Sequence, residues 1–127
     1  MRYTVKGEDT VSQEGNLMNE KGELAAGLTL ELRRGTIVLC VLSQLRQPMY
    51  GYSLVSVLSD GGVPVETNTL YPLLRRLEKQ GLLISSWETS GSKPRKYYQI
   101  TDLGNEIYLE LKHQWQETTQ HMTELLA

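Results

Sequence analysis

The spacing of apolar residues predicts two helices in the first half of the chain. A broad apolar stripe follows Thr29, a suitable N-cap, and must end before Pro48, because proline cannot continue a helix. The members of this stripe are Leu32, Ile37, Val38, Val41, Leu42 and Leu45. A second, shorter helix opens at residues 50–52 and stops at the two glycines of residues 61–62. Its apolar side consists of Leu54, Val57 and Leu58.

The chain before the first helix has no such pattern. Residues 1–27 are polar, contain four glycines and show no sustained apolar period. We therefore predict a flexible tail over these residues, because a segment of this composition has little apolar surface to bury. Translation from Met1 and translation from Met18 both fit the sequence, and the role of the tail is open.

A third helix has the most regular pattern in the chain. Four leucines recur at i, i+3, i+4 and i+7 and define an inner face, and Gly81 provides a left-handed stop; the leucines are Leu70, Leu73, Leu74 and Leu77. The opposite face is polar and basic, and consists of Asn68, Tyr71, Pro72, Arg75 and Lys79, with Arg76 on its flank. Because a proline deep in a helix costs about 3 kcal/mol, we expect this helix to begin only a few residues before Pro72. Residues 67–69 then place hydroxyl and amide groups at an exposed helix N-terminus, which favours a phosphate.

A β-hairpin and a long helix complete the predicted order of elements. One strand leads from Leu82 through Trp87, and a second runs from Lys96 to Thr101, with a turn-rich connection between them. The tip is basic, since three cations fall within four residues: Lys93, Arg95 and Lys96. An ordinary solvated loop is the alternative, but the adjacent cationic helix favours a DNA-binding wing.

The last helix starts at Thr101 and Asp102 and runs to the end of the sequence. Its apolar seam steps by four and three residues and consists of Leu111, Trp115, Thr118, Met122 and Leu125. So small a domain cannot bury this seam alone, so we predict a homodimer; folding back on the first helix is the intramolecular alternative. Two Trp115 rings across a two-fold axis would also offer a slot for a flat aromatic ligand, although plain interface packing is the simpler interpretation.

The net charge of −2 argues against a nucleic-acid partner until its distribution is considered. Residues 67–100 contain six basic residues and two acids, a charge of +4, whereas the rest of the chain carries −6. The charge is therefore segregated in the way that a one-sided DNA surface requires.

Other kinds of chemistry find little support in the sequence. No nucleophile and base pair or phosphate loop is present, and the one metal-ligand spacing is weak, so we expect neither an enzyme nor a cofactor. Glu110 and His113 match a spacing used in di-metal proteins, but one copy is weak and solvated helix residues are the better interpretation. Cys40 lies in the apolar run of residues 37–42 and is expected in the core. That run is too short to cross a bilayer and no secretory signal is apparent, so we expect a soluble cytoplasmic protein.

Three segments together resemble the PadR family of bacterial transcriptional regulators, in its short class with a single C-terminal helix. They are Tyr50-Gly51-Tyr52, the run from Thr69 to Leu82, and the run from Pro94 to Gly104. The resemblance spans about residues 30–126 and implies a winged helix-turn-helix dimer that represses its own or a neighbouring promoter. The DNA contacts that it implies are Tyr52, Asn68, Thr69, Tyr71, Arg75, Lys93, Arg95 and Lys96.

The resemblance also implies a role for Trp115, because drug-responsive members place a tryptophan in the dimer interface beside a flat hydrophobic ligand. One departure is Glu66-Thr67-Asn68, where many relatives carry Ser-Pro-Gly. Glu66 puts a negative charge near the DNA face, so base preference is expected to differ.

These observations predict a mainly α protein with a small β-hairpin. Its parts are a tail over residues 1–27, a winged helix-turn-helix over residues 28–101, and a dimerisation helix over residues 102–127. We expect a sequence-specific regulator, a repressor that binds double-stranded DNA as a homodimer on a pseudo-palindromic operator and is released by an aromatic ligand. Arg76 and Lys79 are added to the DNA contacts because they lie on the same helix surface. The alternative, supported by the acidic net charge, is a winged-helix protein-interaction module without DNA binding.

Overall fold

The computed structural model describes the backbone from Thr10 and the side chains from Gly15 to the last residue, Ala127, and the chain divides after Gly35 into two compact units. Helix α1 spans Thr10–Gln44. In the first unit it is the one element of the described residues, and its side chains from Gly15 to Gly35 are exposed.

Helix α1 corrects the prediction for the start of the chain. The chain is helical from Thr10, so Thr29 is not an N-cap and the expected tail is not irregular over residues 10–27; residues 1–9 lie outside the described residues. Alanine, leucine, glutamate and lysine, all good helix formers, are frequent in residues 17–26, and helix propensity overcomes the penalty of about 1 kcal/mol for each glycine. The division of the chain into tail, DNA-binding domain and dimerisation helix stays a prediction.

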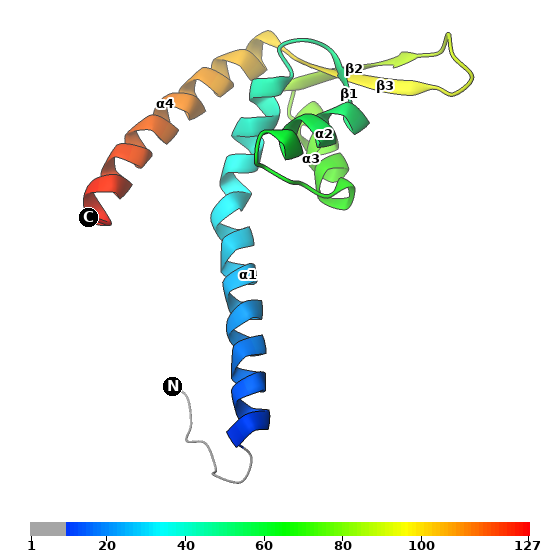
Figure 1. Ribbon diagram of the computed structural model, residues 1–127. Coiled ribbons are helices and arrows are strands. Elements are labelled where there is room, and N and C mark those ends of the chain that lie inside the picture. The colour runs from blue at the N-terminus through cyan, green and yellow to red at the C-terminus, as the bar shows by residue number, and fades with distance from the viewer. Residues whose placement is uncertain (1–9) are drawn as a thin grey trace. The chain divides into compact units, whose positions relative to one another are not determined.

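The second unit contains the end of α1, three further helices and a small sheet (Figure 1). The helices are α2 (Gly51–Asp60), α3 (Thr67–Lys79) and α4 (Asp102–Leu125). The strands are β1 (Met49–Tyr50), β2 (Leu83–Glu88) and β3 (Arg95–Ile100). The predicted mainly α fold, with a hairpin and a long C-terminal helix, is confirmed.

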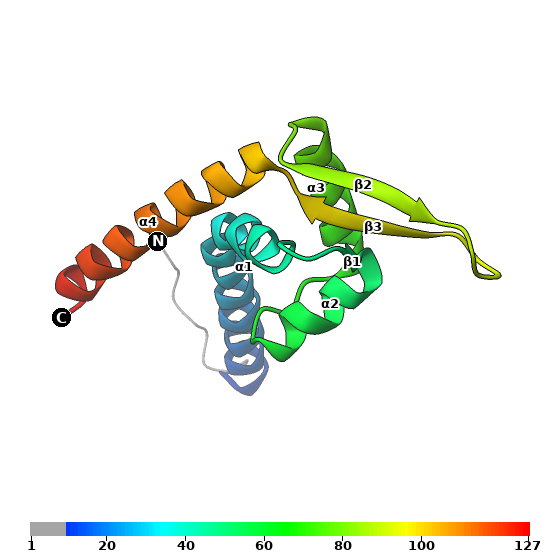
Figure 2. The same ribbon diagram turned by 90° about the horizontal axis from the view of Figure 1, so that it is seen from above.

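The sheet has three antiparallel strands in the order β1-β3-β2, and the hairpin of β2 and β3 extends beyond α2 and α3 (Figure 2). The hairpin pairs Leu83 with Ile100 at its base and Glu88 with Arg95 at its tip. Strand β1 was not predicted, because a strand of two residues shows no alternation of apolar and polar positions. It pairs Tyr50 with Tyr97 and so ties the start of α2 to the wing.

The core of the second unit lies where the end of α1, α2 and α3 meet. Its fully buried side chains are Val41, Leu42, Leu45, Leu54, Leu70, Leu74 and Leu77. Each contributes about 1.5–3 kcal/mol by leaving water. Three members of the predicted apolar faces are not buried as expected: Leu73 is only half-buried, Val57 is exposed, and Leu32, in the first unit, is exposed as well. No helix in the described part of the chain has a stretch long and apolar enough to cross a membrane.

One junction joins α3, the sheet and α4. Gly81 has a φ of +83°, which lets the chain leave α3 and enter β2. Thr101 donates its backbone N–H to the Leu82 carbonyl at 3.0 Å and its hydroxyl to the Gly81 carbonyl at 2.7 Å. The same hydroxyl oxygen accepts from the Gly104 N–H at 2.9 Å and caps α4. The end of α3 and the start of α4 are therefore held at one point.

Candidate nucleic-acid interface

Helix α3 presents an open N-terminus. Its N-cap, Glu66, has an extended backbone and makes no side-chain capping bond. Residues 67–69 are exposed, as are Arg75, Arg76 and Lys79 further along the helix. Pro72 is the sixth residue of α3, so the prediction that the helix begins only a few residues before it is confirmed. Free amides at an exposed N-terminus, followed by three cations, form a surface suited to phosphates.

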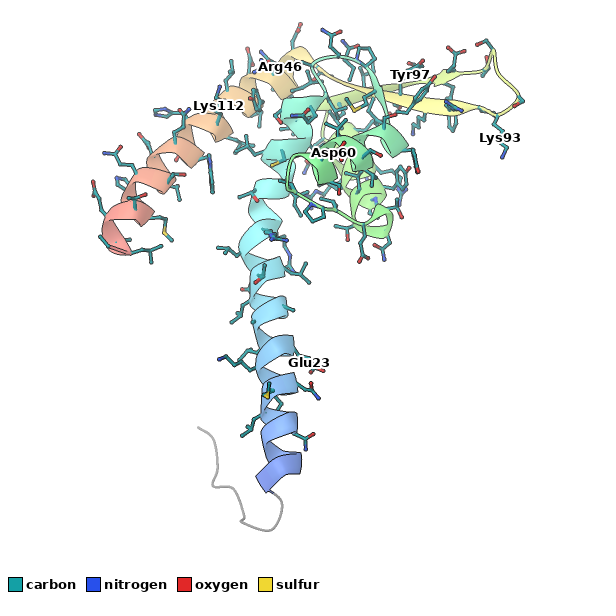
Figure 3. All side chains as sticks on the ribbon, viewed as in Figure 1. Glu23, Arg46, Asp60, Lys93, Tyr97 and Lys112 are labelled. Atoms are coloured by element: carbon teal, nitrogen blue, oxygen red, sulfur yellow. The ribbon has the colours of Figure 1, made fainter. Side chains whose placement is uncertain are left out.

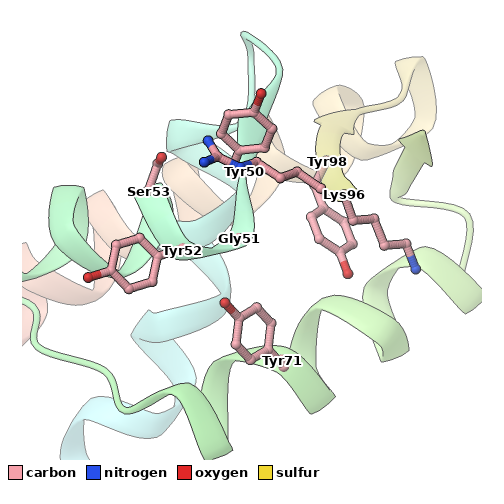
Figure 4. A pocket seen from close by; sticks show the side chains of 8 residues that line it. Tyr50, Gly51, Tyr52, Ser53, Tyr71, Lys96 and Tyr98 are labelled. Atoms are coloured by element: carbon pink, nitrogen blue, oxygen red, sulfur yellow. The ribbon is translucent and has the colours of Figure 1, made fainter. Parts of the chain in front are cut away.

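A pocket of about 640 Å³ lies where α2, α3 and β3 come together (Figure 4). Its lining residues are Tyr50, Gly51, Tyr52, Ser53, Tyr71, Arg95, Lys96 and Tyr98. The pocket thus collects four predicted DNA contacts from three separate elements: Tyr52, Tyr71, Arg95 and Lys96. Tyr52 is 73% exposed, so its ring is available to a partner rather than packed in the core.

Gly51 explains why Tyr71 can take its place in this pocket. A Cβ atom at residue 51 would lie 2.6 Å from Cε1 of Tyr71, far inside contact distance. In Figure 4 the Tyr71 ring rises from α3 toward Gly51 at the start of α2. The glycine of the Tyr-Gly-Tyr segment therefore lets the tyrosine of α3 pack against α2.

A tyrosine pair that sequence reasoning missed joins β1 to the middle of the hairpin. The rings of Tyr50 and Tyr97 are stacked with centroids 4.2 Å apart, and their hydroxyls are 2.8 Å apart. The hydrogen bond with Tyr50 raises the pKa of Tyr97. The Arg95 guanidinium lies 5.1 Å from the centre of the Tyr50 ring, a cation–π distance, so Arg95 and Tyr50 line the same side of the pocket. Both tyrosines were visible in the sequence, but their pairing depends on β1.

The three cations of the wing differ in their surroundings. Lys93 is exposed at the tip of the hairpin (Figure 3), and Arg95 is also exposed. Lys96 is half-buried, and its Nζ lies 3.5 Å from Oε1 of Glu78 on α3. At the tip, hydrogen bonds from the hydroxyl and the backbone N–H of Ser90 lower the pKa of the Glu88 carboxyl. The wing therefore carries two exposed cations and one that is paired with a carboxylate of the chain.

The C-terminal helix is buried only near its start. Gly104 and Tyr108 are buried, and the Arg46 guanidinium lies 4.8 Å from the centre of the Tyr108 ring. Of the predicted seam, Leu111 packs against the core, whereas Trp115, Met122 and Leu125 are 47%, 40% and 78% exposed and Thr118 is exposed as well. A large apolar surface is therefore open on the single chain.

The groups considered for other chemistry have ordinary surroundings. Nε2 of His113 lies 3.2 Å from Oε1 of Glu117, one turn along α4. No set of three potential metal ligands comes together within the described residues. Cys40 is half-buried against the core, and burial raises the pKa of its thiol. A less acidic thiol is a poorer nucleophile at neutral pH.

Comparisons with known proteins give the family. Residues 38–110 match the Transcriptional regulator PadR-like family. The transcriptional regulator Rv3488 of Mycobacterium tuberculosis is 30% identical over 93 residues, which cover 72% of this chain and 87% of that protein.

Solved structures agree in fold. The crystal structure of a PadR family transcriptional regulator from Eggerthella lenta is 53% identical, with a TM-score of 0.79 over 84% of this chain and 96% of that one. The structure of a PadR-like transcription factor from Bacteroides fragilis is 31% identical, with a TM-score of 0.66 over 78% of this chain and 98% of that one. The predicted winged-helix fold is thereby confirmed. The chain belongs to the PadR-like family of transcriptional regulators, and its role is regulatory rather than enzymatic.

Proposed function

We propose that the protein regulates transcription by binding duplex DNA through the face formed by α2, α3 and the wing. The observation that carries this proposal is the shared pocket, which brings Tyr52, Tyr71 and Arg95 together from α2, α3 and β3. A protein that reads DNA needs such a face, with a helix for the major groove and flanking groups for the backbone. Lys96 is set apart from the proposed contacts by its carboxylate partner, Glu78. The proposed contacts are Tyr52, Asn68, Thr69, Tyr71, Arg75, Arg76, Lys79, Lys93 and Arg95.

Binding is tested first with DNA of two kinds. The selected duplex is the sequence that the wild-type protein enriches from a random library, and the random duplex is an unselected pool of the same length. A sequence-specific regulator binds the selected duplex at least a thousandfold more tightly at physiological salt. Equal and weak binding to both would instead support the alternative of a protein-interaction module.

Arg75 is the proposed base-reading residue, because its guanidinium fork matches the two acceptors of guanine in the major groove. It is exposed on the outward face of α3. Arg75→Ala should weaken binding to the selected duplex by about 1–3 kcal/mol more than binding to the random duplex. Lys112→Ala, which removes an exposed cation from α4, is the control and should change neither. An equal loss on both duplexes would reassign Arg75 to the phosphate backbone.

The wing cations are proposed to contact phosphates. Each lost contact should reduce the slope of log K against log salt by about 0.9 per protomer. Lys93→Gln and Arg95→Gln are the variants, since both residues are exposed. A slope that stays at the wild-type value in the double variant would remove the wing from the interface.

The protein is further proposed to act as a homodimer through α4. The exposed side chains Trp115, Met122 and Leu125 support this, because a monomer rarely leaves such a seam open. A charge on the seam, Met122→Glu, should shift the protein toward monomer in sedimentation velocity. Gln120→Glu, on the same helix but off the seam, should leave the dimer intact.

Repression and release by an aromatic ligand complete the proposal. A repressor bound to a pseudo-palindromic operator blocks its promoter, and a reporter gene behind the selected duplex measures this directly. The ligand site proposed is the pair of Trp115 rings at the dimer axis, each 47% exposed on a single chain. In a Trp87→Phe background, Trp115 is the one remaining tryptophan. A flat aromatic ligand should then quench its emission and weaken DNA binding over the same concentration range.

A further inference from the structure

We propose that Glu78 is a positioning residue that fixes the wing to the recognition helix, and that Lys96 serves this contact rather than a DNA phosphate. The consequences for DNA rest on the proposed function. The contact itself lies within the chain and can be tested without DNA.

The Glu78 carboxylate holds both strands of the hairpin. Its Oε1 lies 3.5 Å from Lys96 Nζ on β3, and its Oε2 accepts a hydrogen bond from the Ser85 hydroxyl on β2. Ser85 is paired with Tyr98, two residues from Lys96, so the two partners of Glu78 point to the same face of the hairpin. One side chain near the end of α3 therefore contacts both strands of the hairpin that forms the wing.

Lys96 differs from the other wing cations because its ammonium group already has a carboxylate partner. Its Nζ lies 5.4 Å from the centre of the Tyr98 ring and 5.8 Å from that of Trp87, in addition to the Glu78 carboxylate. Side-chain exposure is 29% for Lys96 and 32% for Glu78, so both are partly withdrawn from water. A cation held by one carboxylate and two rings has less to gain from a phosphate than the exposed Lys93.

The position of Glu78 in α3 also supports a role in the contact with the wing. It is the second-to-last residue of the helix, where the dipole disfavours a negative charge, and it lies on a protein face that is otherwise basic. Removing that negative charge would by itself increase the affinity of the protein for DNA. Glu78→Gln should therefore have two effects. It should raise the affinity for any DNA, because a negative charge is lost. It should also reduce discrimination between sequences, because the wing is no longer held in register with α3.

Glu88→Gln is the matched control for charge, because Glu88 lies on the wing but has Ser90 as its partner. Both glutamine variants should bind the random duplex about twofold to fivefold more tightly, as expected for losing one partly exposed negative charge. Only Glu78→Gln should reduce the ratio of selected to random affinity, by about threefold or more. Ser85→Ala should reduce the ratio in the same direction without any change of charge.

The salt dependence separates Lys96 from Lys93. Lys93→Gln should lower the slope of log K against log salt by about 0.9 per protomer, and Lys96→Gln should leave the slope within error of wild type. An equal decrease in both variants would overturn the assignment of Lys96. An unchanged ratio in both Glu78→Gln and Ser85→Ala would overturn the positioning role of Glu78.

A double-mutant cycle in urea unfolding tests the contact without DNA. Glu78→Gln and Lys96→Gln should be coupled by about twofold to fivefold in the unfolding equilibrium constant. The pair Glu88→Gln and Lys96→Gln should be additive. Absence of coupling between Glu78 and Lys96 would refute the inference whether or not DNA is bound. Clear coupling in a protein that fails to bind duplex DNA would refute the proposed function and leave the positioning contact standing.

Discussion

Replacing Gly104 by alanine should destabilise the protein, although alanine is the better helix former. Gly104 is buried in the first turn of α4. A Cβ atom there would lie 2.1 Å from the Leu82 carbonyl oxygen and 2.7 Å from Cγ1 of Ile100. Relief of such contacts requires the start of α4 to move by about 1 Å from the backbone it packs on.

The magnitude follows from what holds that backbone. Overpacking at a buried site costs about 1–3 kcal/mol. The Leu82 carbonyl also accepts the Thr101 N–H, and Gly104 donates to the Thr101 hydroxyl, so a displacement weakens two hydrogen bonds worth about 1 kcal/mol each. The gain in helix propensity is about 1 kcal/mol in the opposite direction. A net loss of about 2–4 kcal/mol is expected.

Urea unfolding followed by circular dichroism measures the difference at one fixed protein concentration, because the stability of the proposed dimer would depend on concentration. Gly35→Ala is the matched control, since Gly35 lies in α1 and a Cβ atom there meets nothing within 4 Å. This control should be neutral or stabilising by up to about 1 kcal/mol. If Gly104→Ala were as stable as Gly35→Ala, the close approach of α4 to Leu82 would not exist.

Three further predictions concern the same unit. Thr101→Val should lower the free energy of unfolding by about 1 kcal/mol in urea, because it removes the hydroxyl that caps α4; an unchanged value would mean that the cap is dispensable. Gly51→Ala should displace the Tyr71 ring and weaken binding to the selected duplex while changing stability by less than about 1 kcal/mol, since a side chain rather than backbone must move; unaltered DNA binding would argue against a role for that ring. The raised pKa of Tyr97 contributes stability that is present below the ordinary tyrosine pKa of about 10 and is lost as pH rises through the folded value. Tyr50→Phe should therefore lower the pKa of Tyr97 in an absorbance titration, and a value that stays raised would assign the shift to another cause.

The elements that the sequence predicted well are those whose signals are local. The leucine spacing of α3 and the left-handed stop at Gly81 are properties of a few neighbouring residues, and they gave its limits closely. Thr101 at the start of α4 is another local signal, and its capping bond is present. The outward face of α3 followed from the inward one except at Tyr71, which packs against α2, and the contacts of this face with DNA stay predictions.

The features that the sequence did not predict depend on distant partners. Strand β1 exists because Met49 and Tyr50 pair with β3, 47 or more residues along the chain. Glu78 counted in the sequence only as an acid among cations, since its partners Ser85 and Lys96 are set by the hairpin register. The first 18 residues of α1, residues 10–27, also escaped detection, because three glycines and the absence of an apolar stripe concealed a helical segment whose described side chains are exposed.

The junction around Thr101 limits how a ligand on α4 could influence DNA binding. The hydroxyl and N–H of Thr101 bind the carbonyls of Gly81 and Leu82, which follow the C-cap of α3, and Gly104 fits against the second of these. Rotation of the first turn of α4 relative to α3 would break these bonds and create the clash that Gly104→Ala imitates. The ligand proposed at Trp115 would lie three turns further along, where α4 is exposed. We therefore expect it to act by changing the angle between the two α4 helices of a dimer, and so the spacing of the two α3 helices, while each winged helix moves as a rigid body.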